Sequence, residues 1–319
     1  MRNHLTMIHY ARDYLKYRRS LGFVLRSHGR LTMQFARFVD RHHRTRRLTI
    51  DLMLGWVNDK ATYSPSYRAH RLSAVRGFAC YLAARDGQTP IPAARLLSVR
   101  LRRCRPHIYS PRQLRQLLAA AGRLHPHYKL RPLTYQTLLG LLAATGLRIS
   151  EAVSLTRGQV DLDRGLLQIT QTKFKKSRVV PLHSTTIRAL RHYRNERDRH
   201  WGVRPEGAFF LNATGKPIPT GTVDVVFRQL CERLGWQRGN GELPKPRLHD
   251  LRHTFACRCL LIWHRNGQDI AQRMAALATY LGHSKVSDTY WYLTGTAELL
   301  AIAGNRFGSF ADAAERNNT

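Results

Sequence analysis

The feature that most constrains the fold is a long helical stretch that stops at a turn-rich, basic segment. Apolar side chains recur at helical spacing through residues 5–86, and the pattern ends at GQTPIP. The next run, LLSVRLRRCRPH, is basic and has little helical pattern. The length of 319 residues also suits two domains better than one. We therefore predict a helical domain over residues 1–88, a basic linker over 89–109, a second domain over 110–305 and a tail over 306–319.

Helix start signals mark elements within both domains. Thr49 is placed to cap a short helix, and Ser64 followed by Pro65 begins a longer one. Ser110 and Pro111 repeat this signal where the second domain begins. Four further helices are expected near Ser184–Arg199, Thr222–Leu234, Arg252–Trp263 and Gln268–Tyr280.

Residues 165–182 interrupt the helical pattern. Two short β-branched and apolar runs, GLLQITQT and SRVVPL, lie on either side of KFKK and predict a small hairpin or sheet. The predicted fold class is mostly α, with a helical N-terminal domain and a mainly α second domain that carries a small antiparallel β-sheet.

The charge balance points to a polyanionic partner. The chain has 53 Lys and Arg against 20 Asp and Glu, a formal net charge of +33. Self-repulsion on this scale destabilises a compact chain, and nucleic acid relieves it because each neutralised phosphate releases counterions. A generic basic protein, such as a ribosome-associated one, is the alternative. Exposed arginines on the N-terminal helices are the candidates for nucleic-acid contact: Arg18, Arg19, Arg37, Arg41, Arg44, Arg46, Arg47, Arg68, Arg71 and Arg76.

Several protein classes are disfavoured by what the sequence lacks. No G-x-x-x-x-G-K-[ST] loop occurs, so no ATP-driven step is indicated. The five cysteines form no C-x-x-C pair, which disfavours a disulfide framework and suits a reducing cytoplasm. No run is apolar enough for a signal peptide or a membrane span. We therefore expect a cytoplasmic protein without a membrane partner.

Four separated segments carry residues whose chemistry belongs together. They are ATGLRISEAVSL with Arg148, TKFKKSRVVPL with Lys173, LHDLRHTFA with His249 and Arg252, and YLGHSKVSDTYWYL with His283 and Tyr292. Two guanidiniums can clamp the oxygens of a phosphodiester and stabilise the charge that develops during attack. A tyrosine hydroxyl can serve as the nucleophile if a neighbouring group takes its proton.

These segments resemble the tyrosine recombinase (phage integrase) family. The family pattern is G-L-R-x-S/T-E, a hairpin lysine, H-x-L-R-H, L-G-H, and a tyrosine nine residues after that last histidine. The chain matches this pattern in identity and order over residues 110–300, and Glu151 and Asp161 also fit. Six residues of the required types in the right order over this distance are a specific signal.

The resemblance implies a site-specific recombinase of the Xer-like or transposon-integrase type. It implies the DNA breaking-rejoining enzyme fold, preceded by a SAM-like core-binding domain. The implied partners are double-stranded DNA with specific core sites and a homotetramer in the synaptic complex, with an accessory recombinase left open. The family reaction needs no metal ion, ATP or other cofactor.

The resemblance also assigns a role to each site residue. Arg148 and Arg252 would clamp the phosphate, and His283 would add a hydrogen bond to it. His249 would act as base or hydrogen-bond donor, and Lys173 would protonate the departing 5′ oxygen. Tyr292 would attack and form a covalent 3′-phosphotyrosine.

Each of these residues also has a simpler structural interpretation, or a neighbour that could take its place. Arg148 could simply pair with Glu151, and Lys176 is a second candidate for the hairpin lysine. Tyr290 competes with Tyr292, although the spacing from His283 selects Tyr292.

Alternative functions also remain open at this point. His249 and His253 are spaced like a zinc pair, but the metalloprotease motif H-E-x-x-H is absent. A type IB topoisomerase would use similar residues, and a catalytically idle DNA-binding relative would keep the fold. The apolar stripe Leu299, Leu300, Ile302 and Phe307 could pack on its own domain or dock on a neighbouring protomer.

Overall fold

A computed structural model describes residues 6–42, 47–97, 105–125, 130–170, 177–203, 206–236, 245–283, 285–294, 299–301 and 304. Lys173, Lys176 and the tail over 306–319 lie outside these residues. The chain divides into two compact units, Met1–Arg103 and Cys104–Thr319. In the part of the chain described, no helix is long and apolar enough to cross a membrane.

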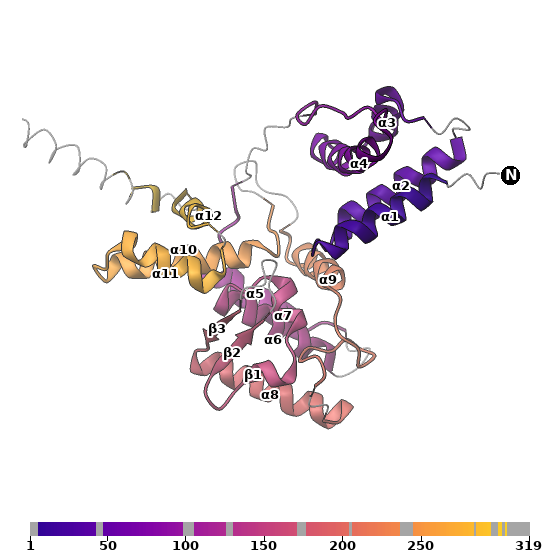
Figure 1. Ribbon diagram of the computed structural model, residues 1–319. Helices are drawn as coiled ribbons and strands as arrows, with labels where there is room; N and C mark the ends of the chain where they lie inside the picture. Colours follow the sequence, from indigo (N-terminus) through magenta and orange to yellow (C-terminus); the bar gives the residue numbers. More distant parts are fainter. Residues whose placement is uncertain are drawn as a thin grey trace, which may run out of the picture. The chain divides into compact units, whose positions relative to one another are not determined.

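In the described part of the first unit, four helices pack around one apolar core (Figure 1). The helices are α1 (Met7–Ser20), α2 (Arg26–His42), α3 (Ile50–Val57) and α4 (Pro65–Asp86). The predicted caps are confirmed, because Thr49 accepts from the N–H of Leu52 and Ser64 accepts from the N–H of Tyr67. Phe35, Met53 and Phe78 are fully buried where α2, α3 and α4 meet.

Arg71 corrects one expectation, because it is not an exposed arginine. Its side chain is only 3% exposed, and its guanidinium lies 3.7 Å from the ring centroid of Trp56. It also pairs with Asp59 at 3.1 Å and donates to the carbonyl of Trp56. A planar guanidinium can stack and hydrogen-bond at once, which lets a cation lie in the core. Arg71 therefore stabilises the fold and is not available to a nucleic acid.

Replacing Arg71 with Met should destabilise the protein. The change removes the stacking and the ion pair, so we expect a loss of about 2–4 kcal/mol in the free energy of unfolding. Urea unfolding at pH 7 measures it. The matched control is Arg37→Met on the exposed face of α2, which should shift stability by less than about 0.5 kcal/mol. Equal effects of the two substitutions would contradict this account of Arg71.

The second unit is mainly helical around a central helix, α6 (Leu130–Thr145). This helix packs against α5 (Pro111–Gly122), α8 (Ser184–Trp201) and α10 (Asp250–Arg265). Five leucines of α6 are buried: Leu130, Leu138, Leu139, Leu141 and Leu142. Ser110 forms a complete capping box with Gln113 at the start of α5, as the sequence predicted. The same core also includes residues of α9 (Thr220–Arg233).

A three-stranded antiparallel sheet interrupts the helices in the order β1-β2-β3. Its strands are β1 (Val160–Asp161), β2 (Leu166–Ile169) and β3 (Arg178–Pro181). Leu167 pairs with Val180 and both are buried in the core, whereas Gln168 and Val179 pair on the exposed face. The mostly α fold with a small antiparallel sheet is thus confirmed.

The remaining elements form a second apolar cluster in this unit. α11 (Ile270–Leu281) packs against α10, and the short helices α12 (Ser287–Tyr290) and η2 (Trp291–Thr294) follow (Figure 1). Tyr292, Leu299 and residues of α10 and α11 share this cluster. Leu299 is fully buried and Leu300 is 47% exposed, so at Leu299 the stripe packs on its own domain. Ile302 and Phe307 lie outside the described residues.

Candidate active site

The candidate site is organised by the C-terminal end of α11. Gly282 takes a left-handed conformation there, with φ +67°, and ends the helix. The last carbonyls of a helix have no partner within it and carry its partial negative charge. Three successive carbonyls each accept from a different arginine: Tyr280 from Arg178 Nε at 2.7 Å, Leu281 from Arg252 Nη2 at 2.7 Å and Gly282 from Arg148 Nη2 at 2.9 Å.

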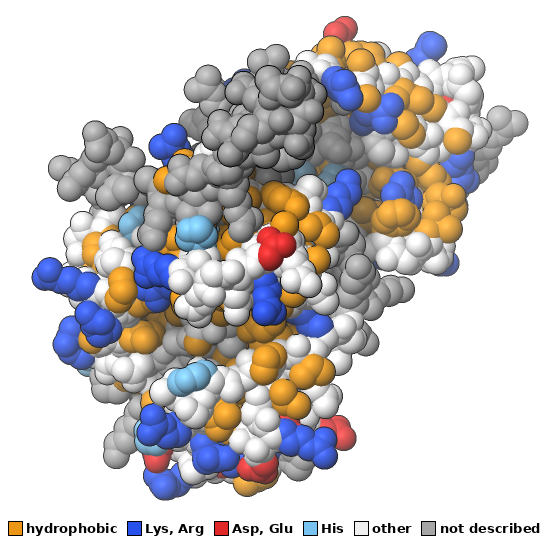
Figure 2. Space-filling model, turned by 90° about the vertical axis from the view of Figure 1, so that its left-hand side faces the viewer, with side chains coloured by type: hydrophobic (Ala, Val, Ile, Leu, Met, Phe, Trp, Pro, Cys, Tyr) orange, Lys and Arg blue, Asp and Glu red, His pale blue; other side chains and the backbone are white. Residues whose placement is uncertain are grey.

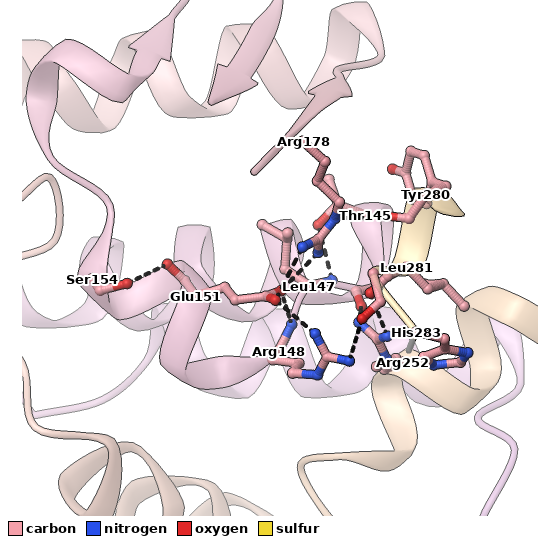
Figure 3. A network of polar contacts seen from close by, with 12 residues as sticks. Thr145, Leu147, Arg148, Glu151, Ser154, Arg178, Arg252, Tyr280, Leu281 and His283 are labelled. Carbon is pink, nitrogen blue, oxygen red and sulfur yellow. Dashed lines mark hydrogen bonds and ion pairs between the residues drawn. The ribbon is translucent and has the colours of Figure 1, made fainter. Parts of the chain in front are cut away.

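Glu151 ties two of these arginines together. Arg178 donates to both carboxylate oxygens, at 3.1 and 2.8 Å, and Arg148 Nη1 donates to Oε1 at 2.8 Å. The backbone N–H of Arg148 donates to Oε2 at 3.0 Å. Figure 3 shows the guanidiniums of Arg148 and Arg178 meeting at this carboxylate, with Arg252 at the end of α11. Burial alone would raise the pKa of Glu151, but the hydrogen bonds from Arg178 and Arg148 outweigh it and lower the pKa.

The positions of the two predicted clamp arginines follow from local structure. Arg148 is the N-cap residue of α7 (Ile149–Ser154), and its side chain keeps 27% exposure. Arg252 lies in the first turn of α10, is only 2% exposed, and donates to the carbonyl of Gly146 at 2.8 Å. The buried Asp250 holds the start of α10 by accepting from the backbone N–H of Arg247 at 3.0 Å and from its guanidinium.

Four aromatic rings form a row that contains the predicted nucleophile. The ring of His249 contacts that of His253, with centroids 5.0 Å apart, and His253 contacts Tyr292 at 5.3 Å. On its other side Tyr292 stacks on His283 at 5.8 Å. The hydroxyl of Tyr292 lies 3.4 Å from His283 Nε2, a long contact of the kind seen in sites without substrate. His283 Nδ1 lies 2.7 Å from Thr289 Oγ1, which holds the ring in place.

Tyr292 and its neighbour Tyr290 have opposite environments. Tyr292 is 2% exposed and packs into the cluster of α10 and α11, whereas Tyr290 is 49% exposed. Burial raises the pKa of Tyr292, and the adjacent Arg252 guanidinium opposes that rise. The Tyr292 hydroxyl therefore stays protonated at neutral pH, and it needs a proton acceptor when it attacks.

The three histidines of the row are neutral at pH 7. Burial and the charges of Arg252 and Arg148 lower the pKa of His283 to about 4. Burial and the neighbouring His249 lower the pKa of His253 to about 3. Desolvation by the surrounding protein and the charge of Arg252 lower the pKa of His249. Part of the His249 side chain nevertheless remains exposed. Neutral imidazoles can accept a proton or donate one hydrogen bond.

The structure brings Arg148, His249, Arg252, His283 and Tyr292 into one region, and Lys173 lies outside the described residues. Two neighbours at the site were missed by the sequence reasoning. Arg178 sits in an ordinary basic run and carried no signal. His253 was considered only as a zinc ligand, although its spacing of four from His249 places both on one helical face. Among the described residues no group of three or more His, Cys, Asp or Glu side chains could hold a metal ion.

Acid should destabilise the folded protein through these histidines. Their folded-state pKa values lie below the unfolded value of about 6.5, so the unfolded chain binds more protons between the two values. The free energy of unfolding should therefore fall as pH drops from about 6.5 toward 4, by up to about 1.4 kcal/mol per pH unit for each of His253 and His283. Urea unfolding at several pH values measures this slope.

His253→Phe tests the origin of that slope. The substitution removes one titrating ring, so the loss of stability between pH 6 and 4 should become smaller than in the wild type. His264→Phe on the exposed face of α10 is the matched control. A wild-type slope in His253→Phe would show that His253 does not contribute.

Comparison with known proteins identifies the family. The model of the phage integrase family matches residues 109–298. The chain belongs to this family, the tyrosine recombinases, and family membership makes it an enzyme of the recombinase class.

The sequences of individual relatives align with most of this chain. A Sinorhizobium fredii protein that carries the name integrase/recombinase y4rB is 40% identical over 300 residues, covering 93% of this chain and 95% of the relative. Tyrosine recombinase XerC of Roseiflexus castenholzii is 32% identical over 251 residues, covering 77% and 74%. The structure of the XerH site-specific recombinase bound to palindromic difH substrate matches with a TM-score of 0.64 at 17% identity, covering 95% and 85%. That likeness supports the fold.

Proposed function

We propose that this protein cuts and rejoins specific double-stranded DNA sites through a covalent 3′-phosphotyrosine on Tyr292. The observation that carries the proposal is the buried Tyr292 hydroxyl beside a cluster of preorganised guanidiniums. Arg252 and Arg148 both act electrostatically on that hydroxyl, and His283 lies 3.4 Å from it. A phosphodiester placed between them would meet a nucleophile on one side and its charge stabilisers on the other.

The charge of the cluster suits a phosphate. The Glu151 carboxylate pairs with two of the three guanidiniums, those of Arg148 and Arg178, whereas Arg252 donates to the neutral carbonyls of Gly146 and Leu281. The excess positive charge is held in place before substrate arrives, so little reorganisation is needed when negative charge develops in the transition state. Arg148 is the more accessible of the two clamp residues and Arg252 the more buried.

The proposed chemistry moves two protons and exchanges one bond. The Tyr292 oxygen bonds to the scissile phosphorus as the bond to the 5′ oxygen breaks. His249 takes the tyrosine proton or supports the hydroxyl by hydrogen bonding, and Lys173 protonates the 5′ oxygen. His283 donates a hydrogen bond to the phosphate. Because one phosphodiester replaces another, rejoining needs no ATP, and none of these steps requires a metal ion or other cofactor.

A basic groove on the first unit would hold the DNA backbone. α1 contributes Arg12, Lys16 and Arg19, and α2 contributes Arg30 and Arg37, around a hollow of about 690 Å³. Among the described residues, no acidic side chain lines this groove. Figure 2 shows Lys and Arg side chains spread over the visible surface, with few Asp or Glu side chains among them. A run of unopposed cations binds phosphates without reading base sequence.

Recombination between two duplexes requires four strand cuts, and each protomer has one Tyr292. A homotetramer on paired DNA sites is therefore the proposed active assembly, with an accessory recombinase as an option. The XerH complex described above is a DNA-bound relative, which supports DNA as the partner.

Tyr292→Phe should abolish covalent trapping on a suicide substrate. The substrate is a core-site duplex nicked near the cleavage position, so that the cut strand is released and rejoining is blocked. The wild type should form a protein–DNA adduct that denaturing electrophoresis resolves, and Tyr292→Phe should form none because it lacks the attacking oxygen.

The exposed Tyr290 provides the matched control. Tyr290→Phe should form adduct at close to the wild-type rate. Adduct loss in Tyr290→Phe with retention in Tyr292→Phe would contradict the assignment of the nucleophile. Efficient relaxation of plasmids without strand exchange would indicate a type IB topoisomerase instead.

Removing charge from the basic groove should weaken DNA binding and its salt dependence together. For Arg12→Gln/Lys16→Gln/Arg19→Gln, the slope of log affinity against log salt should fall by about 0.9 for each phosphate that the protein no longer neutralises. The control is Arg188→Gln/Arg194→Gln/Arg199→Gln on α8. Titrations at several salt concentrations measure both slopes. An unchanged slope in the α1 variant would exclude the groove as a DNA-binding surface.

A further inference from the structure

Arg178 is tied into the candidate site more tightly than a surface arginine of a sheet. Its Nε donates to the carbonyl of Tyr280, and its two terminal nitrogens donate to the two oxygens of Glu151. The side chains of Arg178 and Glu151 are only 10% and 6% exposed. A Cβ at Gly282 would lie 2.8 Å from Arg178 Nη1, so the guanidinium packs directly against that turn.

These contacts make Arg178 unsuited to binding the phosphate itself. All three of its nitrogens are already hydrogen-bonded to protein acceptors. Arg148 shares the same carboxylate but is more accessible, with 27% of its side chain exposed. Both arginines are hydrogen-bonded to protein acceptors, but Arg148 is the more exposed of the two and is the one that a ligand can reach.

The position of Arg148 depends on partners that Arg178 also holds. Glu151 Oε1 accepts from both arginines, and the Gly282 carbonyl that receives Arg148 follows the Tyr280 carbonyl that receives Arg178. A bidentate guanidinium–carboxylate pair fixes the plane of the carboxylate, which a lysine ammonium cannot do. Without Arg178, Glu151 could rotate and the end of α11 would lose one of its three anchors.

We propose that Arg178 is a positioning residue that orients Arg148, through Glu151 and the end of α11, for binding the scissile phosphate. This role rests on the proposed function, because it concerns the same phosphate clamp. It also joins strand β3 directly to the turn that carries His283. The sheet is thereby mechanically connected to the phosphate-binding side of the site.

Arg178→Lys tests the proposal, with cleavage and DNA binding measured separately. Single-turnover cleavage of the suicide substrate at saturating protein should slow at least tenfold, while the Kd for DNA should stay within about twofold of the wild type. The double variant Arg148→Lys/Arg178→Lys should cleave at nearly the rate of Arg148→Lys alone, because Arg178 acts through Arg148.

Arg197→Lys is the matched control for simple loss of a buried arginine. Arg197 is 3% exposed, pairs with Asp198 and donates to the carbonyl of Phe209, away from the site. Arg197→Lys should lower Tm but leave the single-turnover cleavage rate at saturating protein within about twofold of the wild type. Its effect on that rate should add to the effect of Arg148→Lys. Thermal unfolding of each variant reports folding. If Arg178→Lys fails to fold, Arg178→Gln, which keeps a donor for Tyr280, is used in the same comparison.

Three outcomes separate the possibilities. Wild-type cleavage by the Arg178 variants would overturn the positioning role. A slowed Arg178 variant whose effect adds fully to that of Arg148→Lys would also overturn it, since Arg178 would then act independently of Arg148. Failure of the wild type to form adduct would instead refute the proposed function.

Discussion

The structure of the site depends on one electrostatic arrangement, the pairing of three guanidiniums with the C-terminal end of α11. Arg148, Arg178 and Arg252 repel one another, and a carboxylate for each would cancel the charge that a phosphate needs. Carbonyls at a helix end offer partial negative charge and fixed geometry without a full compensating anion. The carboxylate of Glu151 supplies the rest of the negative charge that offsets the arginines. The result is a cluster with excess positive charge, and because α11 ends at the left-handed Gly282, the carbonyls of Tyr280, Leu281 and Gly282 are available to accept from the arginines.

Tyr292, the proposed nucleophile, lies in the opposite kind of environment. Tyr292 packs in the apolar cluster of α10 and α11, with His253 and His283 on either side of its ring. Burial raises the pKa of its hydroxyl, which therefore stays protonated at neutral pH. The same packing limits the rotamers of the tyrosine, which favours attack from one direction. Charge stabilisation and nucleophile placement thus come from two adjoining clusters that meet at Arg252 and His283.

Local signals in the sequence predicted much of the fold. Capping residues such as Thr49 and Ser64 act through neighbours only a few positions away, so they can be read without tertiary contacts. The alternation of residues in β2 and β3 is local in the same way. Arg71 shows the limit of such reading, because its burial depends on Trp56 and Asp59, which the helical pattern alone does not place around it. His253 and Arg178 were missed for the same reason, since their partners Tyr292, Glu151 and Tyr280 are distant in sequence.

The sequence by itself determined the family and the order of Arg148, Lys173, His249, Arg252, His283 and Tyr292, because residue types at set spacings carry that information. It also determined the basic character of the chain. Only the tertiary structure showed that Arg148 is partly exposed at the site while Arg178 and Arg252 are buried against protein acceptors. It also distinguished Tyr292 from Tyr290 by burial. The physical reason is that exposure, hydrogen bonding and pKa depend on groups brought together from α7, β3, α10 and α11, and no local pattern encodes those distances.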